Sequence, residues 1–277
     1  MLESTSVYRK NEWHDRSVQT ERQPATRQPV DNVPMKKRVG LFMTCLADVM
    51  RPSIPMAAVD LLEAAHFEVH VPMAQTCCGQ PAYNSGDRRT ILALAEKFLD
   101  EFEAFDYVVA PSGSCMGTIK THYPDVLKDQ PDLLRRFAAL QPRLFELTDF
   151  LVRIAKLAEV PGRFEGDVTY HDSCSGLREL GIKQQPRQLL ALVPGLSLSE
   201  MAQCEQCCGF GGTFAVKYGN ISAAIADDKC ANIKATQARA VVLGDLGCMM
   251  QIEGRLRRQG DHTTQVLHIA EVLTGKR

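Results

Sequence analysis

The sequence contains no long apolar run and no excess of charge of one sign. No stretch of about 18 apolar residues occurs among the 277, which argues against a transmembrane helix. The first 34 residues lack the apolar centre of a secretory signal. The 32 basic and 33 acidic residues nearly cancel, so the charge gives no reason to expect a nucleic-acid partner or an anionic membrane. We expect a cytoplasmic protein that associates with a membrane only peripherally, through partner proteins.

Residues 1–35 show no helical or strand period and are rich in Arg, Gln, Thr and Pro. This composition predicts a disordered tail. Met35 stands directly before KKRVGLFMTC, where the first apolar run begins. Met35 is therefore a candidate for the true start of the protein.

From residue 36 onward, short apolar runs alternate with amphipathic segments, and the order repeats. Strands that alternate with helices at this spacing predict βαβ units and mainly parallel sheets. The expected fold class is α/β, with two pseudo-symmetric, duplicated, Rossmann-like halves. The predicted domains are a first repeat at 36–124, a helical connector at 125–162 and a second repeat at 163–277. Strands are expected at 38–44, 67–72, 106–111, 167–174, 196–201 and 238–245, and helices at 54–65, 90–105, 185–193, 222–236 and 248–259.

Ten cysteines are many for a chain expected in a reducing compartment, where disulfides are rare. They could be small core residues, because free cysteines are often buried. Their spacing argues otherwise, because three of them return at nearly the same distance: Cys45 and Cys174 are 129 positions apart, Cys78 and Cys208 are 130 apart, and Cys115 and Cys248 are 133 apart. A nearly constant shift across three separate segments indicates an internal duplication.

Each half has a cysteine at a strand end, an adjacent pair followed by glycine, and one further cysteine. The carboxyl ends of parallel strands share one sheet edge, so each set of four thiols should converge there. The glycine after each pair, Gly79 or Gly209, permits a tight turn close to a bound group. The predicted metal ligands are Cys45, Cys77, Cys78 and Cys115 in the first half, and Cys174, Cys207, Cys208 and Cys248 in the second.

Four converging thiolates favour a metal site. Structural zinc usually takes pairs spaced C-x2-4-C, and here only Cys204 and Cys207 have that spacing. Neighbouring side chains of extended backbone point apart, which suits the several iron atoms of an iron–sulfur cluster better than one zinc ion. The spacing therefore favours an iron–sulfur cluster and leaves zinc, or redox thiols without metal, as alternatives.

Five longer stretches carry a resemblance to known proteins: HVPMAQTCCGQPAYNSGD, APSGSCMG, YHDSCSGLREL, CCGFGGTFAVKY and GDLGCMMQIEGRL. The repeated pattern resembles the CCG cysteine-rich domain of heterodisulfide reductase catalytic subunits and of the glycolate oxidase iron–sulfur subunit. Within that group, the sequence from residue 37 onward is similar to the lactate utilization protein A family. That resemblance implies an iron–sulfur electron-transfer subunit, with 4Fe-4S clusters, in a system that oxidises L-lactate to pyruvate without NAD. It also implies two partner subunits, one of them a ferredoxin-like iron–sulfur protein, and an oxidoreductase subunit that depends on them.

The chain departs from the fuller family pattern, which ends each half in C-x-x-C. Ser112 and Asp245 stand at the first of those two cysteine positions, which makes them candidate oxygen ligands. Cys204 is a further candidate ligand outside the repeated pattern. Cys230, inside an expected helix, is predicted to belong to the core.

His171 and Asp172 precede Cys174 and are candidates for a supporting position around the metal, or for a local hydrogen bond at a strand end. The GFGGT stretch lacks a dinucleotide-binding frame and a phosphate-loop lysine, so it predicts a tight turn and no flavin or NAD site. No ferredoxin-type C-x2-C-x2-C-x3-C run is fused to the chain, which disfavours the glycolate oxidase subunit. Two alternatives stay open: a related subunit that acts on a heterodisulfide, a quinone or glycolate, and a structural protein whose thiolates hold zinc.

Overall fold

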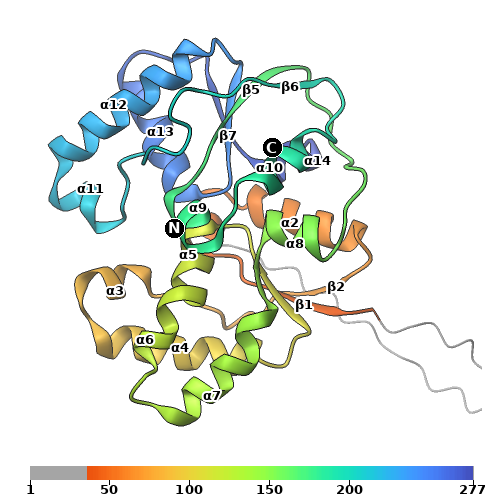
Figure 1. Ribbon diagram of the computed structural model, residues 1–277, viewed down its shortest axis with the longest axis vertical. Helices are drawn as coiled ribbons and strands as arrows, with labels where there is room; N and C mark the ends of the chain where they lie inside the picture. Colours follow the sequence, from red (N-terminus) through yellow and green to blue (C-terminus); the bar gives the residue numbers. More distant parts are fainter. Residues whose placement is uncertain (1–35, 277) are drawn as a thin grey trace, which may run out of the picture. The chain divides into compact units, whose positions relative to one another are not determined.

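Two four-stranded parallel sheets organise residues 36–276, the part of the chain that this computed structural model describes (Figure 1). The first sheet has the order β2-β1-β3-β4, and the second repeats that order as β6-β5-β7-β8. Every pairing within the two sheets is parallel. The strands are β1 Arg38–Leu41, β2 Glu68–His70, β3 Tyr107–Ala110, β4 Leu144–Glu146, β5 Gly166–His171, β6 Leu196–Leu198, β7 Ala240–Leu243 and β8 Gln265–His268. The expected α/β fold of two duplicated halves is confirmed.

The central strands of the two sheets are short apolar runs. β3 reads YVVA and β7 reads AVVL, and every residue of these runs except the half-buried Tyr107 is buried. Parallel strands that are covered on both faces need apolar residues at successive positions, because both sides of the strand meet other side chains. This is why these segments were recognisable as strands from their sequence alone.

Helices connect the strands, and α4 (Arg88–Phe102), one of the longer ones, buries an apolar stripe of Ile91, Ala95, Phe98, Leu99 and Phe102. α4 is capped by Asp87, whose carboxylate accepts a hydrogen bond from the Thr90 N–H at 3.0 Å. The other helices are α1 Cys45–Met50, α2 Ser53–Ala64, α3 Gln80–Ser85, α5 Gly113–Gly117, α6 Tyr123–Val126, α7 Pro131–Leu140, α8 Leu147–Arg153, α9 Cys174–Leu180, α10 Gln184–Leu190, α11 Thr213–Lys217, α12 Gly219–Ala235, α13 Leu246–Arg258 and α14 Ile269–Thr274. Two further helical turns are η1 Thr118–His122 and η2 Gln141–Arg143.

The segment 125–162, for which a helical connector was expected, contains both helices and a strand. α7 and α8 are helical as expected, but β4 lies between them and pairs with β3. The counterpart of β4 in the second half is β8, near the end of the chain. The first sheet is therefore completed by residues that had been expected in the connector.

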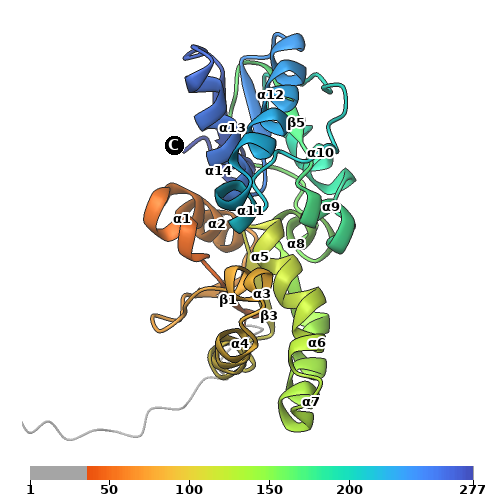
Figure 2. The ribbon, with the colours of Figure 1, turned by 90° about the vertical axis from the view of Figure 1, so that its left-hand side faces the viewer.

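The two halves pack against each other reciprocally. α8, at the end of the first half, contacts α10 of the second, and α14, at the end of the second half, contacts α2 of the first. α5 of the first half also packs on α9 of the second, and both views show this pair between the two sheets (Figures 1 and 2). One hydrophobic core accordingly takes side chains from both halves, including Leu41 and Leu62 from the first, and Tyr170 and Leu267 from the second.

Two acidic side chains at equivalent helix positions fix this packing. Glu271 is the third residue of α14 and accepts hydrogen bonds from Arg51 Nε at 2.8 Å and Ser53 Oγ at 2.7 Å. Asp149 is the third residue of α8 and accepts one from Gln185 Nε2 at 3.0 Å. Each carboxylate therefore binds a side chain of the opposite half, as expected for a duplicated structure with pseudo-twofold symmetry.

Within residues 36–276, no helix combines the length and the apolar character that a bilayer crossing requires. The disordered tail predicted for 1–35 and the proposed start at Met35 lie outside the described residues.

Candidate metal centre

The first group of thiols follows the carboxyl ends of β1, β2 and β3. Cys45 is the first residue of α1, which follows β1, and Cys115 is the third residue of α5, which follows β3. The pair Cys77 and Cys78 lies in the loop between β2 and α3. The thiols of Cys45 and Cys78 both interact with that of Cys77, and Cys78 also interacts with Cys115. The four residues line one cavity of about 280 Å³.

The second group repeats this arrangement. Cys174 is the first residue of α9 and Cys248 is the third residue of α13, while the adjacent pair lies in the loop after β6. The thiols of Cys174 and Cys208 both interact with that of Cys207, and Cys208 also interacts with Cys248. These four line a cavity of about 100 Å³. The structure thus brings together the eight cysteines predicted as ligands, in two groups of four.

The glycine after each cysteine pair has two structural roles. Gly79 and Gly209 have φ angles of +80° and +89°, in the left-handed region that favours glycine. The N–H of Gly79 donates to the Cys77 sulfur at 3.4 Å, and the N–H of Gly209 donates to the Cys207 sulfur at 3.3 Å. The turn directs a backbone donor at the first sulfur of each pair, which explains why glycine follows both pairs.

The two glycines differ in the space around them, and this leads to a testable difference. A Cβ at position 209 would lie 2.5 Å from the carbonyl oxygen of Ser222, whereas one at position 79 would lie 3.0 Å from Ile91 Cγ1. Left-handed backbone costs a non-glycine residue about 1 kcal/mol. We expect Gly209→Ala to lower the free energy of unfolding by about 3 kcal/mol, because the clash adds to that cost, and Gly79→Ala by about half as much. Urea denaturation of the metal-free protein measures both.

Gly181→Ala is the matched control, because Gly181 has a φ of +69° and a Cβ added there would meet no atom within 4 Å. It should lose only the backbone contribution, about 1 kcal/mol. Equal losses at positions 181 and 209 would contradict the assigned close approach of Gly209 to α12.

The first thiol of each adjacent pair has a lowered pKa. The pKa of Cys77 is lowered because the thiols of Cys45 and Cys78 form hydrogen bonds to its sulfur, and the pKa of Cys207 is lowered by Cys174 and Cys208 in the same way. The pKa of Cys45 is raised by its interaction with Cys77 and by burial. The crowding of thiols therefore favours a thiolate at the first cysteine of each pair, and a bound metal would displace the protons of the others.

The two cavities are neighbours. Gln80, Ser114, Phe210 and Gly212 line both of them. Gln80 and Phe210 each directly follow the glycine of a cysteine pair, so these two side chains occupy equivalent positions in the two halves. Neither had been singled out in the sequence, although their equivalence follows from the shift of 130 positions.

Ser112 and Asp245, the candidate oxygen ligands, are the N-cap residues of α5 and α13. Asp245 Oδ1 accepts hydrogen bonds from the N–H groups of Gly247 at 3.1 Å and Cys248 at 3.4 Å. Its Oδ2 accepts from Ser114 N–H at 2.8 Å and from Ser112 Oγ at 3.2 Å, both in the other half. Each carboxylate oxygen thus has two donors, and the two residues join the halves between the cysteine groups.

Cys204 and Asp172 lie beside one arginine. Arg187 donates to both carboxylate oxygens of Asp172, at 2.8 and 2.9 Å, and its Nη2 lies 3.9 Å from the Cys204 sulfur. Cys204 lines neither of the cysteine cavities. The buried Lys229 donates to the carbonyls of Gln203 at 2.7 Å and Cys204 at 3.3 Å. These contacts hold the loop before the second cysteine pair. Neither Arg187 nor Lys229 had been singled out in the sequence.

His171 and Cys230 are both fully buried, in different surroundings. Cys230 packs in the core of the second half, as expected. His171 is the last residue of β5, and one of its ring nitrogens and the sulfurs of Cys208 and Cys248 lie within 4.8 Å of one another. Burial lowers the pKa of His171 to about 3, and the nearby charge of Lys229 acts in the same direction.

The sequence that forms these two sites matches known proteins. A model of the cysteine-rich domain named CCG matches residues 39–120 and 168–253, which contain the two cysteine groups. Lactate utilization protein A 2 of Bacillus cereus (strain AH820) is 42% identical over 236 residues, which cover 85% of this chain and 97% of that protein. Lactate utilization protein A of Bacillus pumilus (strain SAFR-032) is 43% identical over 239 residues, covering 86% of this chain and 100% of that protein.

The chain belongs to the lactate utilization protein A family. The resemblance noted in the sequence is thereby confirmed. A crystal structure of a hypothetical protein from Helicobacter pylori has a TM-score of 0.62 and 14% identity, and the match covers 87% of this chain. The chain spans about half of that protein, 49% of its length, and the likeness concerns the fold alone.

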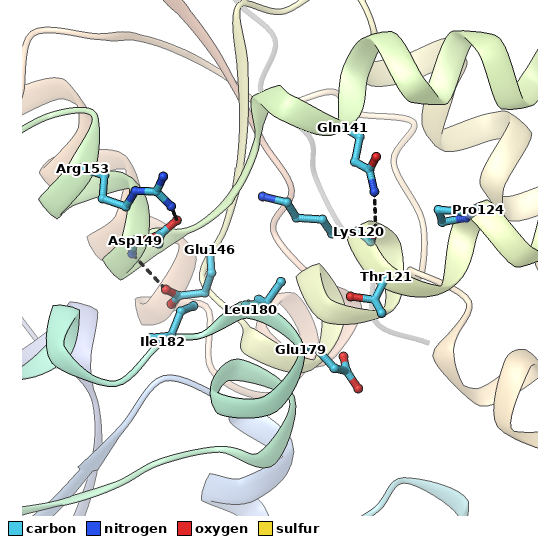
Figure 3. A pocket seen from close by; sticks show the side chains of 10 residues that line it. All are labelled: Lys120, Thr121, Pro124, Gln141, Glu146, Asp149, Arg153, Glu179, Leu180 and Ile182. Carbon is cyan, nitrogen blue, oxygen red and sulfur yellow. Dashed lines mark hydrogen bonds and ion pairs between the residues drawn. The ribbon is translucent and has the colours of Figure 1, made fainter.

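This member of the lactate utilization protein A family has a further cavity, of about 400 Å³, that shares no lining residue with the cysteine cavities. Figure 3 shows Glu146 and Asp149 on one side of it and Lys120 and Gln141 on the other. Glu146 caps α8, and its Oε2 accepts from the Thr148 N–H at 2.8 Å and the Asp149 N–H at 3.2 Å. Burial raises the pKa of Glu146 to about 7, although these hydrogen bonds oppose the shift.

The raised pKa of Glu146 predicts a pH-dependent stability. Its pKa is about 7 in the folded chain and 4.5 as the ordinary value, so the folded state binds the proton more tightly. Stability should therefore fall as pH rises from about 4.5 to 7, by on the order of 3 kcal/mol from this group, and then stay level. Glu146→Gln removes the titration. Its free energy of unfolding, relative to that of the wild type, should therefore increase by on the order of 3 kcal/mol between pH 4.5 and pH 7. A stability difference between the two proteins that does not change across this range would contradict the prediction.

Proposed function

We propose that this chain is the iron–sulfur electron-transfer subunit of a system that oxidises L-lactate to pyruvate. The observation that carries the proposal is the pair of four-thiol groups, one at the corresponding edge of each sheet, lining adjacent cavities. The name of the relatives, lactate utilization protein A, supports the pathway.

The donor set fits iron–sulfur clusters. Each site offers four thiols, which is the number of cysteine ligands that an ordinary 4Fe-4S cluster requires. A backbone N–H already donates to one sulfur in each group, and such hydrogen bonds help to set the reduction potential of a cluster. The proposed ligands are Cys45, Cys77, Cys78 and Cys115 at the first site, and Cys174, Cys207, Cys208 and Cys248 at the second.

Ser112, Asp245 and Cys204 have other partners and are left out of this ligand set. The oxygens of Ser112 and Asp245 are engaged in capping and in bonds between the halves. Asp172 is paired with Arg187, which makes it a support for the loop that carries Cys204. The arrangement thus assigns polar residues to holding the two thiol groups in place.

When bound, the clusters would accept and release electrons one at a time. Oxidation of lactate to pyruvate releases two electrons and two protons, so the substrate chemistry requires further groups, which we assign to two partner subunits. One of them is a ferredoxin-like iron–sulfur protein in this proposal. This chain's own residues bind the clusters and keep them adjacent. We place the system in the reducing cytoplasm, in contact with a membrane only through its partners.

Growth of a deletion strain tests the pathway. Removal of the gene should abolish growth on L-lactate as the carbon source and leave growth on glucose normal. The wild-type gene should restore growth, and so should a Cys230→Ser variant, whereas a Cys45→Ala/Cys174→Ala variant should not. Normal growth of the deletion strain on lactate would contradict the proposed pathway, and would favour a related oxidoreductase that uses another substrate.

A further inference from the structure

The two thiol sites differ at one buried position, three residues before the first cysteine of each group. Phe42 stands three residues before Cys45, and His171 stands three residues before Cys174. Phe42 packs against the rings of Phe98 and Phe102, with centroid distances of 5.6 and 5.7 Å. The first site therefore has an apolar side chain where the second has an imidazole.

His171 is buried with little hydrogen bonding to its ring. Neither Nδ1 nor Nε2 makes a hydrogen bond of good geometry among the residues that the structure describes, although the backbone of Cys204 lies close enough to act on the pKa of the ring, and the side chain is 0% exposed. Leaving a buried polar atom unpaired costs about 1–3 kcal/mol. A phenylalanine at this position, as in the first half, would avoid that cost. An unpaired polar group beside two thiols calls for a partner that a metal-free chain does not supply.

The imidazole is directed at the second thiol group. One ring nitrogen lies within 4.8 Å of the sulfurs of both Cys208 and Cys248, and those two sulfurs lie equally close to each other. Three such atoms around one point form part of a coordination shell, and imidazole is a common ligand of iron and zinc in proteins. Because the ring is enclosed, it already faces the site and loses little conformational freedom when it binds a metal.

We propose that His171 is a metal ligand at the second site, where its imidazole takes the place of one of the four thiolates on one iron, while the first site uses thiolates alone. The inference rests on the proposed iron–sulfur function and adds to it a difference between the two sites. An imidazole is a neutral ligand, and replacement of thiolate by imidazole raises the reduction potential of iron–sulfur centres. The second site would then hold electrons more tightly than an all-thiolate site in the same surroundings.

Pulsed electron paramagnetic resonance on the full-length protein, loaded with iron and sulfide and reduced with dithionite, tests this inference. The protein is produced once with ordinary histidine and once with 15N-histidine, because backbone nitrogens also couple to clusters. In a Cys45→Ala background, where only the second site is filled, a nitrogen coupling should change with the isotope. In a Cys174→Ala background, where only the first site is filled, the isotope should have no effect.

His171→Phe, which copies the first site, should abolish the isotope-sensitive coupling while the cluster remains, and His262→Ala, at an exposed position, should not alter it. The labelled wild-type protein keeps the test decisive even where His171→Phe folds poorly. A filled second site without histidine coupling would overturn the assignment of His171 and leave the proposed function standing. Failure of either site to bind iron would instead contradict the proposed function.

Discussion

Replacement of Cys45 by alanine is expected to lower bound iron and acid-labile sulfide by about half, because one of two four-iron sites loses a ligand. Replacement of Cys174 should have the same effect at the other site, and the double variant should retain almost none. Cys45 is exposed and Cys174 is half-buried, so neither change opens a cavity in the core. Iron, sulfide and the visible absorption of the anaerobically purified variants measure the effect.

Two cysteines outside the groups provide matched controls for this experiment. Cys230 is buried in the core of the second half, and Cys204 lies beside Arg187. Cys230→Ser and Cys204→Ser should each keep the full iron content, although the first will lose some stability because it buries a hydroxyl. Loss of iron in Cys204→Ser, with full retention in Cys174→Ala, would show that the ligand set at the second site has been assigned wrongly.

Asp245→Ala is expected to lower the free energy of unfolding by about 3 kcal/mol. The carboxylate is 2% exposed and accepts four hydrogen bonds, two within α13 and two from Ser112 and Ser114 in the other half. The loss of the cap accounts for about 1 kcal/mol, and the donors left unpaired between the halves account for the rest. Urea denaturation of the metal-free variant gives the value without a contribution from bound metal.

Asp87→Ala separates the two contributions, because Asp87 also caps a helix but is exposed, and its carboxylate accepts from Thr90 within that same helix, α4. That variant should lose only about 1 kcal/mol. Asp245→Asn should fall between the two, since its amide oxygen can still cap α13 while its NH2 group cannot accept from Ser114. If Asp245→Ala costs no more than Asp87→Ala, the hydrogen bonds between the halves contribute nothing measurable.

The duplication could be predicted from sequence because the thiols mark it. Cys45 and Cys174 begin equivalent helices, and each helix follows a strand, so both the spacing and the order of the elements were informative. β4 was missed because three residues carry too little pattern, and its strand conformation depends on pairing with β3, more than 30 residues earlier. Strands this short are set by contacts distant in sequence.

The roles of Ser112 and Asp245 show a different limit. Their positions three residues before a cysteine suggested that they replace missing ligands. Serine and aspartate are also preferred N-cap residues, and a helix begins directly after each. The capping signal was therefore present in the sequence, but the bond between the two halves depends on their packing and was not.

The contrast between Phe42 and His171 was also present in the sequence, at the same shift of 129 positions as Cys45 and Cys174. What the sequence could not supply is the environment of the imidazole. Its burial, its unpaired nitrogens and its approach to Cys208 and Cys248 follow from the way β5 ends beside the loop of the second cysteine pair. The comparison of equivalent positions becomes informative only when the surroundings of each are known.

The central claim is that each half binds an iron–sulfur cluster through its four thiols. Metal and sulfide analysis of the anaerobically purified wild-type protein, combined with electron paramagnetic resonance after reduction, tests it most directly. We expect about eight iron atoms and as many sulfides per chain, with signals from reduced clusters. Stoichiometric zinc without iron or sulfide would contradict the claim.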